Sequence, residues 1–327
     1  MSAPTNQAVL RRLYTGESLQ QATQAVQQLA SGQSPLPAAE DQAQERLEAR
    51  VLLGLLEFRS VYTLYPLGIS AVLPTPTTIT LWVESEDRAA EILFNLLPSA
   101  GEDGEVSGVP GLRITRRLQT SIELGILDRQ AHLRLAGLPS TVWRRAEAKA
   151  MTKWYNPEHL CWRTSPRDWT EAERGHQAMW DDESDHFVHV QHRAAWLGSG
   201  LLRRTGLLHT ATNAYLVDGY RGSAYNLHRI VLRTSHVPGC GPGPQHMVAA
   251  LTDLPFGLPL RLTRVRGDGD QDFTLSDKHG TALLELRASI EPPFRSFPSS
   301  LWRAVLHRLP ARPPQPCPTG APDDRKH

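Results

Sequence analysis

A tryptophan-rich stretch from Trp154 to Trp196 divides the chain into two parts that differ in hydrophobic period. Before it, apolar residues often recur every three or four positions, as they do on one face of a helix. After it, short runs rich in β-branched residues alternate with glycine- and proline-rich turns, a pattern typical of strands. At 327 residues the chain also exceeds the usual size of a single domain. We therefore predict an α+β protein with more than one structural unit.

These changes in pattern predict five consecutive segments. They are a helical segment (1–60), a small α/β domain (61–153), a Trp- and His-rich connector (154–196), a β-rich domain with a terminal helix (197–309) and a disordered Pro-rich tail (310–327). In the helical segment, Leu47, Val51 and Leu55 share one helix face. In the α/β domain, Ile79 and Leu81 alternate with threonines, as in a half-buried strand. No internal repeat is evident from the sequence.

Local signals place individual elements within these segments. Capping residues and apolar spacing predict helices at 85–97, 140–153, 171–180 and 299–309. Short apolar runs predict strands at 65–73, 77–84, 112–115, 132–135, 187–190, 201–209, 213–217, 225–234, 247–251 and 258–265. The turn Asp277 to Gly280 between two further runs predicts a β-hairpin.

The composition argues for an ordinary globular protein. The net charge is +1 and the apolar fraction is 40%, so the whole chain gives no electrostatic reason to bind a nucleic acid or an anionic membrane. Arginine greatly outnumbers lysine, which indicates either codon bias in a GC-rich, bacterial genome or selection for bidentate contacts with phosphate or carboxylate groups. Cys161, Cys240 and Cys317 are isolated and predict neither a zinc-thiolate site nor a disulfide framework. The first residues lack a signal-peptide pattern, and we expect a soluble, cytoplasmic protein with no membrane partner.

An acidic cluster followed by evenly spaced histidines is the first candidate site. Its residues are Asp182, Asp185, His186, His189 and His192. On a strand, His186 and His192 would share a face with His189 opposite, whereas on a helix the three would spread around one side. Two histidines and an aspartate would suit zinc or manganese, and a metal-bound water is a hydrolytic nucleophile. The alternative is that these histidines only lie at a strand edge or a domain interface.

A second candidate is a binding surface made of tryptophan and arginine. Trp162 and Trp169, interleaved with Arg163, would stack on a base or a sugar, or would instead form a small core joining the two halves. Arg203, Arg204, Arg261 and Arg264 would bind phosphate if they shared one face.

No complete catalytic signature occurs, so the sequence leaves open whether the chain is an enzyme. We predict an intracellular, non-catalytic binding or regulatory protein that contacts a phosphate-bearing ligand, a nucleic acid or a protein partner. Nucleic-acid binding through the C-terminal arginines would depend steeply on salt concentration. The alternative is a metal-dependent hydrolase that uses the Asp/His cluster between 181 and 192 with zinc or manganese as its cofactor.

Overall fold

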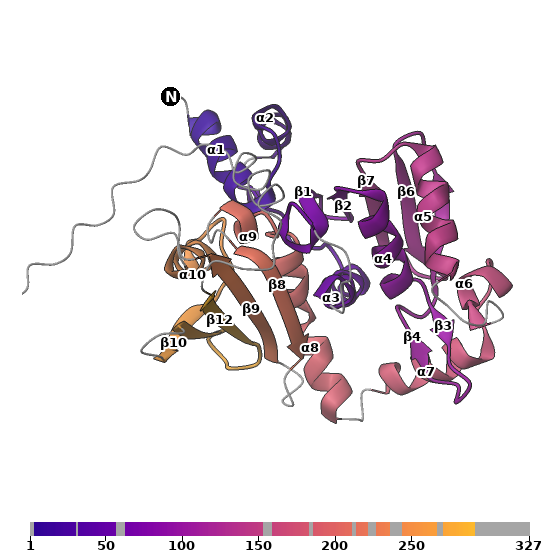
Figure 1. Cartoon of the computed structure of the whole chain (residues 1–327). Helices are drawn as coiled ribbons and strands as arrows, with labels where there is room; N and C mark the ends of the chain where they lie inside the picture. Colours follow the sequence, from indigo (N-terminus) through magenta and orange to yellow (C-terminus); the bar gives the residue numbers. More distant parts are fainter. Residues whose placement is uncertain are drawn as a thin grey trace, which may run out of the picture.

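Two five-stranded sheets flank a central pair of helices, α3 (Gln42–Leu56) and α8 (His186–Leu202) (Figure 1). The computed structural model describes residues 3–30, 32–56, 63–152, 159–182, 186–210, 214–221, 227–235, 244–266 and 271–291. Within these ranges the protein has the α+β class that the sequence predicts. None of the helices in the described ranges is both long and apolar enough to cross a membrane.

The first sheet has the strand order β1-β2-β7-β6-β5. Its strands are β1 (Ile69–Pro74), β2 (Thr78–Val83), β5 (Leu112–Arg117), β6 (Ser121–Ile126) and β7 (His132–Ala136). The central strands β2 and β7 are parallel, and the other neighbours are antiparallel. Helices α4 (Glu86–Leu96) and α5 (Ser140–Thr152) pack side by side against this sheet (Figure 1).

The second sheet has the order β10-β11-β12-β9-β8. Its strands are β8 (Ala214–Arg221), β9 (Leu227–Ser235), β10 (Arg261–Arg266), β11 (Gln271–Ser276) and β12 (Leu283–Glu291), with helix α10 (Pro244–Thr252) between β9 and β10. Again one central pair, β9 and β12, is parallel and the other neighbours are antiparallel. The hairpin predicted around Asp277 to Gly280 is confirmed as the β11–β12 connection.

The two sheets therefore share one topology. In each, a helix precedes an antiparallel pair of strands, and a second helix follows the pair. Three further antiparallel strands come next, and the last of them lies parallel beside the second strand of the pair. We call residues 42–136 the first repeat and residues 186–291 the second repeat. The prediction that the chain has no internal repeat is thus wrong at the level of topology.

A short stretch of sequence carries the same correspondence. Residues 108–116 read GVPGLRITR and residues 257–264 read GLPLRLTR. In each stretch the threonine, Thr115 or Thr263, lies where the strand register shifts by one residue. Its Oγ1 donates to a carbonyl of the next strand at 3.2 Å or 3.0 Å, respectively. The β-bulge and its hydrogen bond are therefore common to both repeats.

The central helices of the repeats pack closely. A Cβ atom at Gly198 on α8 would lie 2.7 Å from Cβ of Ala49 on α3, so only glycine allows this approach. A buried polar network lies in the same interface. Arg203 donates to Glu48 at 2.7 and 2.6 Å, and Ser199 donates to the same carboxylate at 2.6 Å. One continuous cluster of buried apolar side chains includes residues of both repeats.

The remaining elements pack around this centre. Helices α1 (Ala3–Thr15) and α2 (Leu19–Gln27) form a hairpin, and the second begins with a capping box between Ser18 and Gln21. Short helices α6 (Cys161–Thr164) and α9 (Leu207–Thr210) and the longer α7 (Glu171–Asp181) belong to the segments before and after α8. The smaller pieces are η1 (Pro66–Gly68) and the strands β3 (Ser99–Ala100) and β4 (Val106–Ser107).

Several expected strands are helical instead. Residues 187–190 lie in α8, residues 201–209 span the end of α8 and most of α9, and residues 247–251 lie in α10. Short apolar runs fit a buried helix as well as a strand. Here the helices α8, α9 and α10 pack against α3, β8 and β10, respectively. Strand β6, which contributes the buried Ile122 and Leu124, has no counterpart among the expected elements. The expected helix at 299–309 and the tail at 310–327 lie outside the described residues.

Candidate functional site

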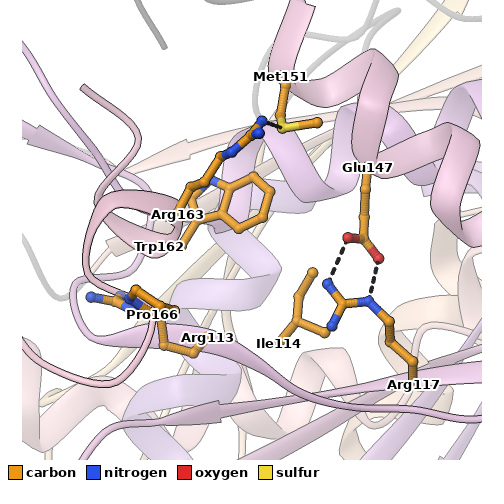
Figure 2. Close-up of a pocket in the computed structure, with 8 residues that line it drawn as sticks. All are labelled: Arg113, Ile114, Arg117, Glu147, Met151, Trp162, Arg163 and Pro166. Atoms are coloured by element: carbon orange, nitrogen blue, oxygen red, sulfur yellow. Dashed lines mark hydrogen bonds and ion pairs between the residues drawn. The ribbon is translucent and has the colours of Figure 1, made fainter. Parts of the chain in front are cut away.

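A pocket of about 310 Å³ lies where the edge strand β5 meets helices α5 and α6 (Figure 2). Eight residues line it, namely Arg113, Ile114, Arg117, Glu147, Met151, Trp162, Arg163 and Pro166. The strand contributes one wall, α5 contributes the glutamate and the methionine, and α6 with the turn after it closes the remaining side. The pocket thus joins the edge strand β5 with two consecutive helices that come later in the sequence.

Arg113 holds in place the segment that closes the pocket on the side of α6. Its guanidinium donates five hydrogen bonds, to both carboxylate oxygens of Glu173 and to the backbone oxygens of Leu112, Ser165 and Asp168, all between 2.8 and 3.1 Å. An arginine has only five N–H donors, so none remains for a ligand. Arg113 therefore supports the pocket and does not offer it a binding group.

Glu173 completes this buried pair. Its carboxylate also accepts hydrogen bonds from the backbone N–H groups of Gly111 and Thr170. Burial by itself would raise the pKa of Glu173, but the hydrogen bonds from Arg113, Thr170 and Gly111 outweigh it and lower the pKa below its ordinary value. The carboxyl group of Glu173 is therefore ionised near neutral pH.

Arg117 and Glu147 face each other across the opposite side of the pocket. The guanidinium donates through Nε at 3.1 Å and through Nη2 at 2.7 Å, one bond to each carboxylate oxygen. The hydrogen bond from Arg117 to Glu147 raises the pKa of Arg117 above its ordinary value. Figure 2 shows the third guanidinium nitrogen turned away from Glu147 and toward Ile114.

Trp162 and Arg163 give the pocket its aromatic and cationic groups. Trp162 is half-buried and packs against the main core, whereas the side chain of Arg163 is exposed. One Arg163 nitrogen lies against Sδ of Met151, which is only a weak acceptor. Among the described residues, Arg163 has no carboxylate partner. The pocket therefore presents an uncompensated positive charge beside an indole ring.

The lining side chains are cationic, apolar and carboxylate groups. They include no serine, cysteine, histidine or lysine that would act as a nucleophile or a proton shuttle. Both oxygens of Glu147, the only lining carboxylate, accept hydrogen bonds from Arg117. The neighbouring Cys161 is buried, and burial raises the pKa of its thiol, which favours the unreactive form.

The predicted metal ligands do not form a cluster in the described structure. Asp182 is the exposed C-terminal cap of α7, while His189 and His192 lie on α8, the first exposed and the second buried. Asp185 and the side chain of His186 lie outside the described residues. Within the described ranges, no group of three His, Cys, Asp or Glu side chains is arranged to hold a metal ion. Zinc or manganese binding stays a prediction, and no observed geometry favours the hydrolase hypothesis.

Of the other predicted ligand-binding residues, three are involved in packing. Trp169 lies against Gly111 and donates through Nε1 to Asp128 at 3.1 Å. Arg203 is buried in the network around Glu48. Arg204 is also buried and donates to the carbonyls of Gly200, Phe256 and Gly257, and burial lowers its pKa to about 10.

Arg261 and Arg264 lie on β10, in the second repeat. All six residues of this edge strand are exposed. The structure therefore brings Trp162 and Arg163 together in the pocket, and Arg261 and Arg264 together on β10, but it separates both pairs from Arg203 and Arg204. The sequence left open whether the four arginines share a face, and only Arg261 and Arg264 do so, because the other two are buried directly after α8.

Sequence reasoning missed Arg113, Arg117 and Glu147. The first two follow a glycine-rich loop in which no phosphate-binding motif exists, and Glu147 lies on an otherwise ordinary amphipathic helix. The available signal was the clustering of arginines in residues 113–117 on a short strand, since charged residues are common on edge strands.

Comparison with known proteins adds no information on function. No protein-family model, curated protein or solved structure matches the chain. The chemistry of the pocket therefore carries the functional argument.

Proposed function

We propose that this protein is a non-catalytic binding protein, and that its pocket holds a small ligand with a planar ring and an anionic group. The observation that carries the proposal is the position of Arg163, a cation without a carboxylate partner among the described residues, beside Trp162 at the wall of a pocket. The anionic group is a phosphate or a carboxylate, because a guanidinium binds both through paired hydrogen bonds.

The size and the apolar lining support a small ligand. A volume of about 310 Å³ is near the lower end of ligand pockets, which span roughly 300–1,000 Å³. Ile114, Met151 and Trp162 supply apolar surface on the strand and on both helices. A planar ring would stack on the indole, and stacking of this kind contributes about 1–3 kcal/mol for a base.

The cationic groups support the choice of an anion. Arg117 uses Nε and Nη2 for Glu147, so its Nη1 is free of that pair and faces Ile114 (Figure 2). Arg163 and this nitrogen lie on opposite sides of the pocket, and a bound anion would satisfy donors from one or both. Arg113 takes no part, because Glu173 and three backbone carbonyls accept all of its hydrogen bonds.

Calorimetric titration of the full chain with phenyl phosphate, benzoate and adenosine monophosphate tests the proposal, with benzamide as the neutral control. We expect an anionic probe to bind and benzamide not to bind. Arg163→Gln should weaken binding by about tenfold to a hundredfold, the loss of one charge-assisted hydrogen bond. Arg264→Gln, which removes the same charge from the other repeat, should leave the affinity unchanged. Equal binding of benzamide, or an equal effect of both variants, would refute the assignment.

A further inference from the structure

We infer that strand β10 is a docking site for an acidic segment of another polypeptide, and that Arg261 binds a glutamate of that segment. The inference does not depend on the pocket, because β10 belongs to the other repeat. It rests on what the equivalent strand of the first repeat already binds.

Strands β5 and β10 occupy the same place in the two repeats. Both are the edge strand of their sheet, and both carry the threonine bulge. The aligned stretches place Arg113 at the position of Arg261 and Ile114 at the position of Leu262. The partner of β5 therefore indicates the kind of partner that suits β10.

In the first repeat, a segment of the same chain covers this strand. Residues 160–173 fold over β5, and Arg113 binds their carbonyls at Ser165 and Asp168 as well as Glu173 in the first turn of α7. Arg113 is 2% exposed, and Ile114 is partly buried against the core. The covering segment thus supplies two carbonyls and one carboxylate to a single arginine.

In the described part of the second repeat, no segment covers β10 in this way. Arg261 is exposed, and its one hydrogen bond to a described residue is a long contact of 3.5 Å to the carbonyl of Lys278. Leu262 is 44% exposed and Val265 is 58% exposed. A partner at β10 would bury these apolar side chains, as the equivalent Ile114 is partly buried in the first repeat.

The bulge at Thr263 places the charges together. Arg261, Arg264 and Arg266 pair in register with Ser276, Thr274 and Asp272, whereas Leu262 and Val265 pair with the buried Leu275 and Phe273. Directly opposed residues share a face of a sheet. Three arginines therefore lie on one face of β10 and two apolar residues on the other.

This arrangement selects an acidic polypeptide over other partners. A second copy of β10 would bring arginines opposite arginines, which is unfavourable. A nucleic acid would contact the arginine face and leave Leu262 and Val265 exposed on the opposite face. An acidic polypeptide satisfies both faces, with a carboxylate at Arg261 and apolar side chains at the other face.

The test measures binding of a fluorescein-labelled peptide to the full-length protein. The peptide has the sequence of residues 159–182 of this chain, which Arg113 already binds. Fluorescence anisotropy should show saturable binding, weakened by at least about tenfold when the peptide carries Glu173→Gln or the protein carries Arg261→Gln. Arg145→Gln, which removes an equal charge from the exposed face of α5, should leave the affinity unchanged.

Three results would overturn the inference. One is no saturable binding up to about 1 mM peptide. Another is binding that does not respond to Arg261→Gln, as expected if the peptide displaces its own copy from β5. The third is Arg261-dependent binding of a thymidine oligonucleotide that the peptide does not compete with, which would identify β10 as a nucleic-acid surface. Since Arg261 is exposed, these variants should fold normally, and circular dichroism checks this.

Discussion

Arg203, in the turn directly after α8, donates to both carboxylate oxygens of Glu48 on α3, and neither side chain is more than 1% exposed. Each repeat contributes one charge to this pair at the interface between the two helices. Arg203 also donates to the backbone carbonyls of Pro37 and Thr75 at 2.8 Å, and Gln44 donates to Glu48 at 2.7 Å. The pair therefore links the central helices to the segments before and after α3.

Removing one member of the pair should destabilise the whole protein. Glu48→Ala leaves the buried guanidinium of Arg203 without its counter-charge, and we expect a loss of about 3–5 kcal/mol in the free energy of unfolding. Arg145→Ala removes the exposed pair with Glu86 and should cost no more than about 1 kcal/mol. Urea denaturation measures both. Equal losses would mean that Arg203 remains solvated or finds another acceptor in the variant.

Two glycines on helices should respond to alanine with opposite signs. At Gly198 an added Cβ would lie 2.7 and 2.9 Å from Cβ and Cα of Ala49, so Gly198→Ala should force α3 and α8 apart and cost about 1–3 kcal/mol. At Gly175 on α7 an added Cβ meets nothing within 4 Å, and Gly175→Ala should stabilise by about 0.4–1 kcal/mol. Thermal unfolding followed by circular dichroism compares the two. A neutral Gly198→Ala would show that the helices adjust freely.

The α+β class and most elements of the first repeat could be predicted from the sequence, because local signals there agree with the fold. Ser85, for example, caps α4 as its position predicts, accepting a hydrogen bond from the N–H of Arg88. The duplication could not be predicted in the same way. It depends on strand pairing between distant residues, and the matching sequence is confined to the few positions around Thr115 and Thr263.

The candidate site was predictable only in part, for a related reason. Trp162 and Arg163 stand out by composition, but the pocket also needs Arg117 and Glu147, which come from β5 and α5. Arg113 and Arg261 occupy equivalent positions, yet one is buried and the other exposed. The difference depends on which segment packs over the strand, and neither composition nor periodicity encodes that contact.

Protonation of His209 should weaken the fold in mild acid. Its ring is buried beside Tyr65, its Nε2 has no hydrogen-bond partner within the described structure, and burial lowers its pKa from 6.5 to about 4. The unfolded chain then binds the proton more readily than the folded protein. The contribution of the neutral His209 to stability is therefore fully present above about pH 6.5 and is lost as the pH falls toward 4. Between about pH 7 and pH 5 this residue should account for a loss of about 2 kcal/mol.

Urea denaturation of wild type and His209→Leu at several pH values isolates this contribution. The variant should lose less stability than wild type on acidification, by the amount attributed to His209. His279→Leu, on the exposed turn of the β11–β12 hairpin, is the control and should follow the wild-type curve. Parallel curves for wild type and His209→Leu would show that the imidazole is accessible to protons in the folded state.

Equivalent arginines of the two repeats should differ sharply when each is replaced by alanine. Arg113→Ala removes five hydrogen bonds and leaves the buried carboxylate of Glu173 without its counter-charge. We therefore expect a loss of about 3–5 kcal/mol in the free energy of unfolding. Arg261→Ala changes an exposed side chain and should alter stability by less than about 0.5 kcal/mol.

Limited trypsin digestion locates the damage. In Arg113→Ala the segment 160–173 loses its attachment to β5, so cleavage after Arg163 and Arg167 should accelerate while the second repeat stays protected. Arg261→Ala should digest like wild type. If Arg113→Ala instead unfolded both repeats together, the segment would be part of one cooperative unit with them. The arginine would then stabilise the whole protein and not only the wall of the pocket.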